Sequence, residues 1–547
     1  MPAKHRAYPL LAILAACIFV VRCVSPIFHF SPTIDEPYHI GSAVCLYESG
    51  RATVGAQHPP LARAVAGIPL RLLGVHWPDA RDNLVVVEYP AFGIGQDILY
   101  SGQAPYWKML AAARFAMLLF PLITLFYVYR LTRYFSNSRE AMLATILVSV
   151  DPTVLGHAFW VGTDAAGCAG FVASVYYGIR WLAKPNSRRA VVFGVIWGLA
   201  IGGKYNCLLI GPFVAAMMVY RVIRRGHRAI VPLTEMIIVV CVVFATLWLV
   251  FRLQYGPIAV QAMFTDQPIW LKLAASWKTA QVPMPSFWLG LLFLVNRANE
   301  GHATYLLGDV SFNGWLSYYP IAVLVKSSIA FLVGGAVVAV IVLRRHRLRT
   351  GVLLTMALAF FVLSVFSKYQ LGIRHLLPIV PLVWIVIAIT LRKWAILLIL
   401  LGAIETAMVH PNYLAFFNIA SGGVGHGERY LIDSNLDWGQ DTARLADWIK
   451  RNSHGRPYAI RVFGATEPLI RNLGLDPKSL TQTPERGLFA ISANVLHRLE
   501  GAKQNADGSI QLGEDYSWLQ SHPTVARVGA SIEVYDLDRQ KTAEDTK

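Results

Sequence analysis

The sequence has few charged residues for its length. Only 15% of its 547 residues are charged, whereas 55% are hydrophobic, and the mean hydropathy is +0.47. A soluble protein of this size would carry roughly a quarter charged residues. The scarcity of charge argues against an ordinary soluble globular protein and predicts a polytopic membrane protein with some soluble portion.

Cysteine is also scarce, and no two cysteines form a Cys-x-x-Cys pair. The six are Cys17, Cys23, Cys45, Cys168, Cys207 and Cys241. Neither a disulfide framework nor a thiolate metal site is therefore indicated. The stretch ending at Cys17 resembles a lipoprotein cleavage site, but its apolar run continues to Val24, so we expect an uncleaved first span.

Acidic residues are outnumbered, with 32 Asp and Glu against 49 Lys and Arg and a net charge of +17. In a soluble protein this excess would suggest a nucleic acid partner. Here the basic residues fall in short clusters between apolar runs, a pattern that membrane topology explains better. We therefore expect no nucleic acid among the partners.

Eleven apolar runs qualify or nearly qualify as membrane spans, because about 20 residues cross a hydrocarbon core of roughly 30 Å. They are residues 8–29, 107–130, 139–155, 164–183, 190–204, 206–222, 230–254, 318–343, 350–367, 374–391 and 394–413. The fifth and sixth runs are short and could form one broken segment.

The basic clusters all fall on one side if every run spans the membrane. The turn at residues 151–163, on the other side, has no Lys or Arg. The clusters are therefore predicted to be cytoplasmic, with the N-terminus. Residues 30–106, 255–317 and 414–547 then face outward.

Two of these outer segments carry further expectations. Residues 61–73 are apolar but are interrupted by Arg63 and Arg71, which favours a helix in the membrane interface with its arginines toward the headgroups. From residue 414 the composition becomes that of a soluble domain, with a helical stretch at 440–450 and strand-like runs at 458–463, 488–492 and 531–537. We expect a transmembrane domain over residues 1–413 and a small α/β domain over 414–547.

Adjacent carboxylates, Asp35 and Glu36, stand where the first span would emerge on the outer side. Like-charge repulsion raises the pKa of one of two adjacent carboxyls, which suits a general base or a metal site. The alternative is that the pair solvates the start of a loop. Asp164 would lie at the same surface and could converge with Asp35, although an acidic residue after Thr163 is also an ordinary helix start.

Several cations break the positive-inside pattern by falling on the outer side, namely Lys204, Lys368, Arg374 and His375. Cations beside acidic residues at that surface suggest an anionic ligand such as phosphate. Snorkelling toward lipid headgroups is the alternative. His58, followed by two prolines, could bind phosphate or sugar or could be structural.

Residues 433–441 resemble the beginning of a calcium loop. An EF-hand needs Gly at its sixth position and Glu at its twelfth, where this chain has Trp438 and Arg444. A loop that leads into a helix N-terminus is therefore the favoured interpretation.

Taken together and in this order, these motifs resemble glycosyltransferase family 39, the bacterial relatives of protein O-mannosyltransferases and of the lipid A aminoarabinose transferase. The matching stretches are residues 33–39, 58–61, 163–164, 203–205, 314–326 and 372–378, with 411–418 and 433–441 resembling a bacterial subgroup. The resemblance implies the C-type glycosyltransferase fold. It also implies transfer of a hexosyl or pentosyl group from a polyprenyl-phosphate donor at the outer face of the bacterial inner membrane.

The resemblance also implies roles for residues. Asp35 would be the base that accepts a proton from the acceptor hydroxyl, Glu36 would orient acceptor or base, and Asp164 would be a further catalytic carboxylate. The substrate-binding residues would be Tyr38, His58, Lys204, Arg374 and His375, the last three holding the donor phosphate. No metal-ligand set is identified, and a requirement for a divalent metal is left open.

A carboxylate base opposite the leaving phosphate favours in-line displacement with inversion. The acceptor could be a lipid, a glycan or a protein, with membrane lipids as further partners. A membrane transporter and an inactive scaffold for envelope assembly are the competing classes. A transporter should carry ionisable residues near the bilayer midplane and paired repeats, neither of which is clear in this chain.

Overall fold

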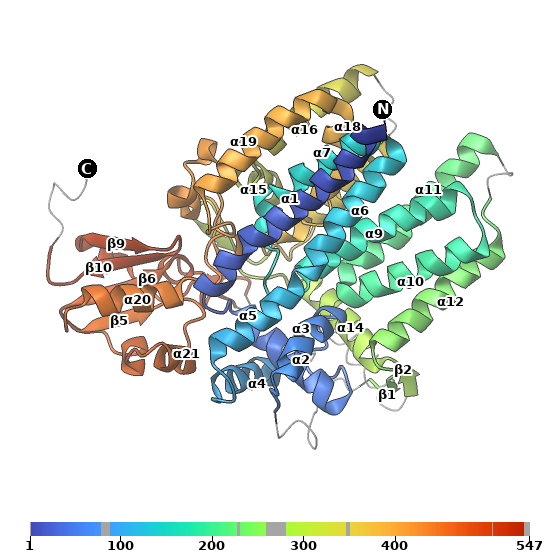
Figure 1. Ribbon diagram of the computed structural model, residues 1–547. Helices are drawn as coiled ribbons and strands as arrows, with labels where there is room; N and C mark the ends of the chain where they lie inside the picture. The colour runs from blue at the N-terminus through green and yellow to red at the C-terminus, as the bar shows by residue number, and fades with distance from the viewer. Residues whose placement is uncertain are drawn as a thin grey trace.

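The computed structural model describes residues 2–77, 88–226, 230–258, 281–345, 350–505 and 507–540. A body of long helices makes up most of the molecule, and a smaller unit with a β-sheet lies against one side of it (Figure 1). The chain order places the helices first and the sheet last.

Each of the eleven predicted apolar runs contains at least one long helix. These are α1 (Pro2–His29), α5 (Tyr106–Met117), α6 (Leu119–Phe135), α7 (Ser138–Ser149), α9 (Asp164–Ala183), α10 (Ser187–Gly203), α11 (Ile210–Arg225), α12 (Leu233–Val250), α15 (Tyr318–Lys326), α16 (Ile329–Arg345), α17 (Gly351–Val365), α18 (Val380–Leu391) and α19 (Ala395–Met408). The chain is therefore a polytopic helical membrane protein, as predicted.

Length and composition decide which of these helices can cross a membrane. Within the described ranges, five helical stretches are long and apolar enough to cross a membrane, or six if α15 and α16, bent by 118°, count as one. They are Ala7–His29, Tyr106–Phe135, Tyr205–Arg224, Leu233–Val250 and Val380–Met408. The total of eleven stays a prediction.

The other described α-helices and strands before the C-terminal unit connect these helices. They are α2 (Asp35–Ser49), α3 (Leu61–Leu72), α4 (Glu88–Tyr100), α8 (Pro152–Gly156), α14 (Pro285–Glu300), β1 (Tyr255–Pro257), β2 (Gln281–Pro283), β3 (Thr304–Leu306) and β4 (Asp309–Ser311). Helices α2 and α4 approach so closely that a Cβ on Gly95 would lie 1.7 Å from the Pro37 carbonyl oxygen. Gly95 therefore sets how α4 supports the start of α2.

The predicted orientation of Arg63 toward lipid headgroups is wrong. Arg63 is only 3% exposed, and its guanidinium donates to the carbonyls of Val54, at 3.1 Å, and Gly55, at 2.6 Å. It satisfies loop carbonyls that burial removes from water. Arg71 on the same helix is exposed.

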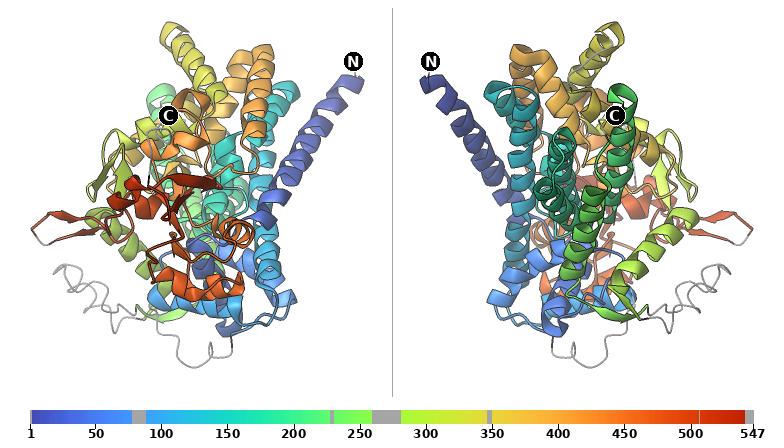
Figure 2. Two further views of the ribbon diagram at one scale, coloured as in Figure 1. Left: turned by 90° about the vertical axis from the view of Figure 1, so that its left-hand side faces the viewer. Right: turned by 90° about the vertical axis from the view of Figure 1, so that its right-hand side faces the viewer.

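The C-terminal unit is built on a four-stranded sheet in the order β5-β6-β10-β9. Strands β5 (Tyr458–Arg461) and β6 (Leu488–Ser492) are parallel, whereas β10 (Ile532–Asp536) pairs antiparallel with β6 and β9 (Thr524–Val528). Helix α20 (Thr442–Asn452) packs on the sheet through Leu445 and Ile449. The expected strands are present, and β9 completes the sheet. Helix α21 (Glu467–Asn472) contacts α4 of the helical body (Figure 2).

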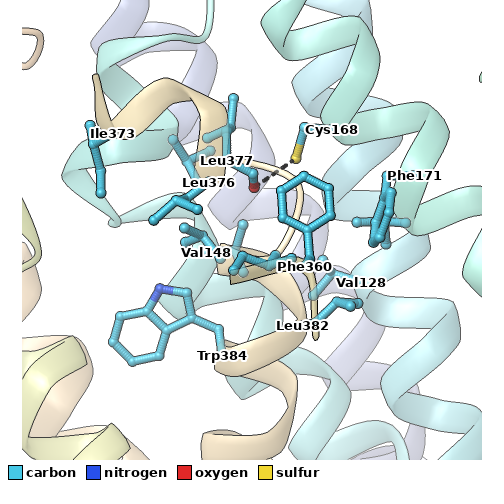
Figure 3. Packing of buried hydrophobic residues seen from close by; sticks show 14 of the residues in the cluster. Val128, Val148, Cys168, Phe171, Phe360, Ile373, Leu376, Leu377, Leu382 and Trp384 are labelled. Carbon is cyan, nitrogen blue, oxygen red and sulfur yellow. Dashed lines mark hydrogen bonds between the residues drawn. The ribbon is translucent and has the colours of Figure 1, made fainter. Parts of the chain in front are cut away.

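The packed core of the body connects two elements that carry polar residues at their ends. The Cys168 thiol of α9 donates to the Leu377 carbonyl at 3.5 Å, beside Phe171, Phe360 and Trp384 (Figure 3). Cys168 lies one helical turn after Asp164, and Leu377 lies three residues after Arg374. This packing therefore fixes the distance between those two charged residues.

Candidate active site

Four charged side chains from four separate segments meet at one end of the long helices. The Arg374 Nη1 atom lies 3.3 Å from Asp35 Oδ2 and 3.5 Å from Asp164 Oδ2. Lys204 Nζ donates to the other oxygen of Asp164. The expected convergence of Asp35 with Asp164 is thus seen, with both predicted cations between or beside them.

Local structure explains why these residues stand where they do. Asp35 and Asp164 are the first residues of α2 and α9, where the helix dipole favours a carboxylate. Lys204 directly follows α10, and its side chain crosses α9 at Gly167. A Cβ on Gly167 would lie 2.8 Å from Lys204 Cβ, so only glycine leaves room for the lysine.

The two carboxylates of this cluster differ in their exposure and in the number of cations that they contact. The Asp35 side chain is 41% exposed and has one ion-pair contact, to Arg374, whereas Asp164 is 12% exposed and engages both cations. Desolvation raises the pKa of Asp35 above its ordinary value; Arg374 opposes this rise, and Asp433 and Asp164 add to it. Asp35 is therefore the carboxylate best placed to take up a proton.

Glu36 lies in a different environment from its neighbour. Its side chain is 0% exposed and forms an ion pair with Arg114, with nitrogen to oxygen distances of 2.8 and 2.6 Å. The same carboxylate accepts the backbone N–H groups of Thr33 and Val161 at 2.9 and 3.1 Å. With every acceptor position used inside the fold, Glu36 has no surface with which to orient an acceptor.

Arg114 explains what this buried pair does. Its guanidinium also donates to the carbonyls of Ile27, Phe30 and Ser31 at 2.8 to 3.0 Å. The pair therefore ties α5 to the segment that ends in Asp35, and Glu36 positions Asp35 without facing the site itself. Its only signal in the sequence is an arginine inside the apolar run 107–130.

Residues 433–441 form one wall of the cluster. The Trp438 ring lies under the Arg374 guanidinium, 4.5 Å from ring centroid to Cζ. The backbone N–H of Ile34 donates to the Trp438 carbonyl at 3.0 Å, and that of Ser31 to the Gln440 carbonyl at 3.1 Å. The stretch does lead into a helix, since α20 begins at Thr442. No group of three metal-ligating side chains occurs in the part of the chain that the structure describes.

Asp433 is a carboxylate that the sequence interpretation did not assign to the site. Its φ of 57° is a left-handed conformation that costs a non-glycine residue energy. The conformation is held by the backbone N–H of Asp433, which donates to Asn494 Oδ1 at 2.7 Å. Desolvation raises the pKa of Asp433, and Arg374 opposes that rise.

A cluster of rings adjoins the charged residues. The His39 and His58 ring centroids are 5.1 Å apart, Tyr38 lies 6.0 Å from His58, and the Arg63 guanidinium stands 5.3 Å from the Tyr38 centroid. Burial and the Arg63 charge lower the pKa of His58 to about 3. His58 is therefore neutral and suits a sugar hydroxyl better than a phosphate.

His375 and Lys326 are both held by neighbours. His375 Nδ1 lies 3.2 Å from the Tyr319 hydroxyl, and its ring stacks on Tyr369 at 6.0 Å. Lys326, in the matching stretch 314–326, is 3% exposed. It donates to the carbonyls of Leu414 and Asn435 at 2.8 and 2.5 Å. Lys326 thus anchors the segment that leads to residues 433–441.

Comparison with known proteins gives one match by sequence and several by structure. Residues 108–249 match the family model described as dolichyl-phosphate-mannose-protein mannosyltransferase. No curated protein matches the chain.

Similar solved structures include ArnT from Cupriavidus metallidurans bound to undecaprenyl phosphate, with 11% identity, a TM-score of 0.45 and coverage of 97% of this chain and 98% of that one. The S. cerevisiae protein O-mannosyltransferase Pmt1-Pmt2 complex bound to the sugar donor has 18% identity and a TM-score of 0.35, covering 45% and 33%. The Archaeoglobus fulgidus oligosaccharyltransferase has 14% identity and a TM-score of 0.43, covering 83% and 58%.

Proposed function

We propose that the chain is a C-type glycosyltransferase that transfers a sugar with inversion from a polyprenyl-phosphate donor. The match of residues 108–249 to the family model described as dolichyl-phosphate-mannose-protein mannosyltransferase supports this proposal. The acceptor is a lipid, glycan or protein at the outer face of the bacterial inner membrane. The matched segment contains Asp164 and Lys204, two of the four clustered charges.

The observation that carries the proposal is the contact of Arg374 with Asp35 at 3.3 Å. A donor phosphate held by Arg374 and Lys204 places the anomeric carbon beside Asp35. Asp35 takes the proton of the acceptor hydroxyl, whose oxygen bonds to the anomeric carbon as the bond to the phosphate oxygen breaks. Polyprenyl phosphate leaves, and the two cations stabilise its developing negative charge.

The other residues support this reaction from their observed positions. Asp164 holds Lys204 and Arg374 in place through its two oxygens. Neutral His58, with Tyr38, lines the side on which sugar hydroxyls would lie, and His375 extends the wall beside Arg374. In this mechanism Glu36 acts through the segment that it positions and does not touch the substrate.

The placement of the site at the ends of helices suits a lipid-linked donor. Asp35 and Asp164 open their helices, so the cluster lies where a carrier can keep its tail in lipid and its phosphate at the surface. A transporter would instead place such residues near the midplane. In the proposed topology the N-terminus is cytoplasmic, and the transmembrane domain 1–413 and the C-terminal domain 414–547 meet on the outer side.

Donor binding tests the phosphate role separately from catalysis. A charge-assisted hydrogen bond contributes about 1.5 to 3 kcal/mol, so Lys204→Ala should weaken binding of undecaprenyl phosphate to the purified protein roughly 10- to 100-fold. Lys368→Ala is the matched control, because Lys368 is an exposed cation with no ion pair in the described residues. Asp35→Asn should bind at least as tightly as wild type, since it removes a negative charge. Equal affinities of wild type and Lys204→Ala would refute the phosphate role.

A further inference from the structure

A second concave site lies at the opposite ends of α6 and α9 from the candidate active site. Its cavity has a volume of about 540 Å³, and five basic side chains line it without any carboxylate. They are Arg130, Arg133, Arg180, Lys184 and Arg189. We call this cavity the α6–α9 pocket; the two helices run side by side (Figure 1).

Two arginines of the pocket are held together by one phenol. Arg130 Nη2 and Arg180 Nη1 both donate to the Tyr176 hydroxyl, at 2.9 and 3.0 Å. The two nitrogens therefore lie within about 6 Å of each other, a distance at which like charges repel. Tyr176 is 5% exposed, so the arrangement is built into the fold.

No acidic side chain compensates this charge within the described ranges. None of the five basic residues forms an ion pair there. The buried carboxylates on adjoining helices are otherwise engaged: Glu140 accepts from Ser136 Oγ at 3.5 Å, and Glu235 accepts from Trp181 Nε1 at 3.0 Å. The positive charge of the pocket is therefore not neutralised by any carboxylate in the described residues.

The pocket and the candidate active site are far apart. Helix α9 begins at Asp164 and ends at Ala183, a length of 20 residues, which is about 30 Å along the axis. Arg180 and Lys184 therefore lie one membrane thickness from the charged cluster. With the active site on the outer side, the pocket faces the cytoplasm.

An apolar surface leads away from the pocket along α6. Phe126 is 52% exposed and Leu119 is 48% exposed, and both share a helix face with Arg130 and Arg133. The Arg130 guanidinium stands 5.6 Å from the Phe126 centroid. A ligand in the pocket would therefore have cations at its head and exposed hydrocarbon along its tail.

We propose that the α6–α9 pocket binds the phosphodiester headgroup of an anionic phospholipid, with the acyl chains along Leu119 and Phe126. Guanidinium groups match phosphate oxygens in charge and in fork geometry. A phosphate between Arg130 and Arg180 would relieve their repulsion. Basic pockets between membrane helices on the cytoplasmic side are suited to such headgroups.

The test compares lipid retention by the purified full chain. Native mass spectrometry would count phosphatidylglycerol and phosphatidylcholine retained from an equimolar mixture. Wild type should prefer phosphatidylglycerol, and Arg130→Ala/Arg180→Ala should lower its retention roughly 30-fold. The control, Arg139→Ala/Arg188→Ala, removes two exposed cations of the same predicted side that lie outside the pocket lining, and should retain the lipid as wild type does.

Three outcomes would overturn the proposal. Equal losses of phosphatidylglycerol from both double variants would show that general surface charge retains the lipid. No preference between the two lipids would show that the pocket does not recognise an anionic headgroup. Complete displacement by millimolar glycerol 3-phosphate would mean a soluble phosphate ester as the ligand. If the first variant does not purify as folded protein, Arg133→Ala/Lys184→Ala, which alters two exposed side chains, gives the same comparison.

Discussion

Arg374→Gln should move the acid limb of the pH–rate profile to higher pH. The limb follows deprotonation of Asp35, and the Arg374 Nη1 atom, 3.3 Å from Asp35 Oδ2, stabilises the charged carboxylate. An opposite charge this close lowers a carboxyl pKa by about 1 to 3 units. Because the Asp35 side chain is 41% exposed, solvent screening favours the lower end of that range. The expected shift is about one pH unit upward, with a rate about ten-fold lower well below the limb.

Asp433→Asn supplies the opposite perturbation. The Asp433 carboxylate raises the pKa of Asp35, so its removal should move the acid limb to lower pH. The assay is label transfer at saturating donor, measured as kcat against pH, because Arg374 is also assigned to phosphate binding and saturation separates the two roles. Acid limbs that coincide in wild type and both variants would show that the titrating base is not Asp35.

Two substitutions test how the site is supported. Glu36→Gln leaves the buried Arg114 charge without its carboxylate and should destabilise the protein by about 3 to 5 kcal/mol, seen as a lower thermal midpoint in detergent; a midpoint equal to wild type would contradict the positioning role. Gly167→Ala places a Cβ 2.8 Å from Lys204 Cβ. It should weaken donor binding and lower the free energy of unfolding by about 1 to 3 kcal/mol. The control is Gly203→Ala, whose Cβ would lie 3.4 Å from its nearest neighbour and which should leave donor affinity and stability nearly unchanged. Equal effects of the two substitutions would contradict the inference that Gly167→Ala acts by displacing the Lys204 side chain.

The charged cluster could be predicted because each of its members is a charged residue beside an apolar run, on the side that the basic clusters avoid. Asp35 and Asp164 follow apolar runs on the side that lacks basic clusters, and Lys204 and Arg374 are cations on that same side. Topology alone then places all four at one surface. Their contact within that surface depends on long-range packing, such as that of Cys168 against Leu377.

The supporting contacts could not be predicted, because nothing local encodes them. Glu36 is adjacent to Asp35 and is also acidic, so the sequence does not distinguish their environments. Pairing with Arg114, 78 residues later, nevertheless buries Glu36 completely. Arg63 has the pattern of an interfacial residue, but two loop carbonyls bind it inside the fold. In both cases a partner distant in sequence or a loop conformation decided the environment.

Residues 433–441 are interpreted from the sequence as a loop that leads into a helix, but their packing against the site could not be predicted. Their polar sequence is typical of a solvated loop. However, Trp438 packs on Arg374, and the segment hydrogen-bonds to Ser31 and Ile34. The polar groups there satisfy one another and the adjoining backbone, which allows such a sequence to lie buried beside the site.

The most direct test of the proposed reaction is sugar transfer by Asp35→Asn beside wild type. Purified protein in lipid would receive a panel of radiolabelled polyprenyl-phosphate sugars, with membrane extract as acceptor. The substitution should not disturb folding, because desolvation penalises the charged form of Asp35 and asparagine is neutral. We expect label to move only with wild type, while both proteins show the same thermal midpoint and bind undecaprenyl phosphate. Transfer at a near-normal rate by Asp35→Asn would contradict the assignment of Asp35 as the base.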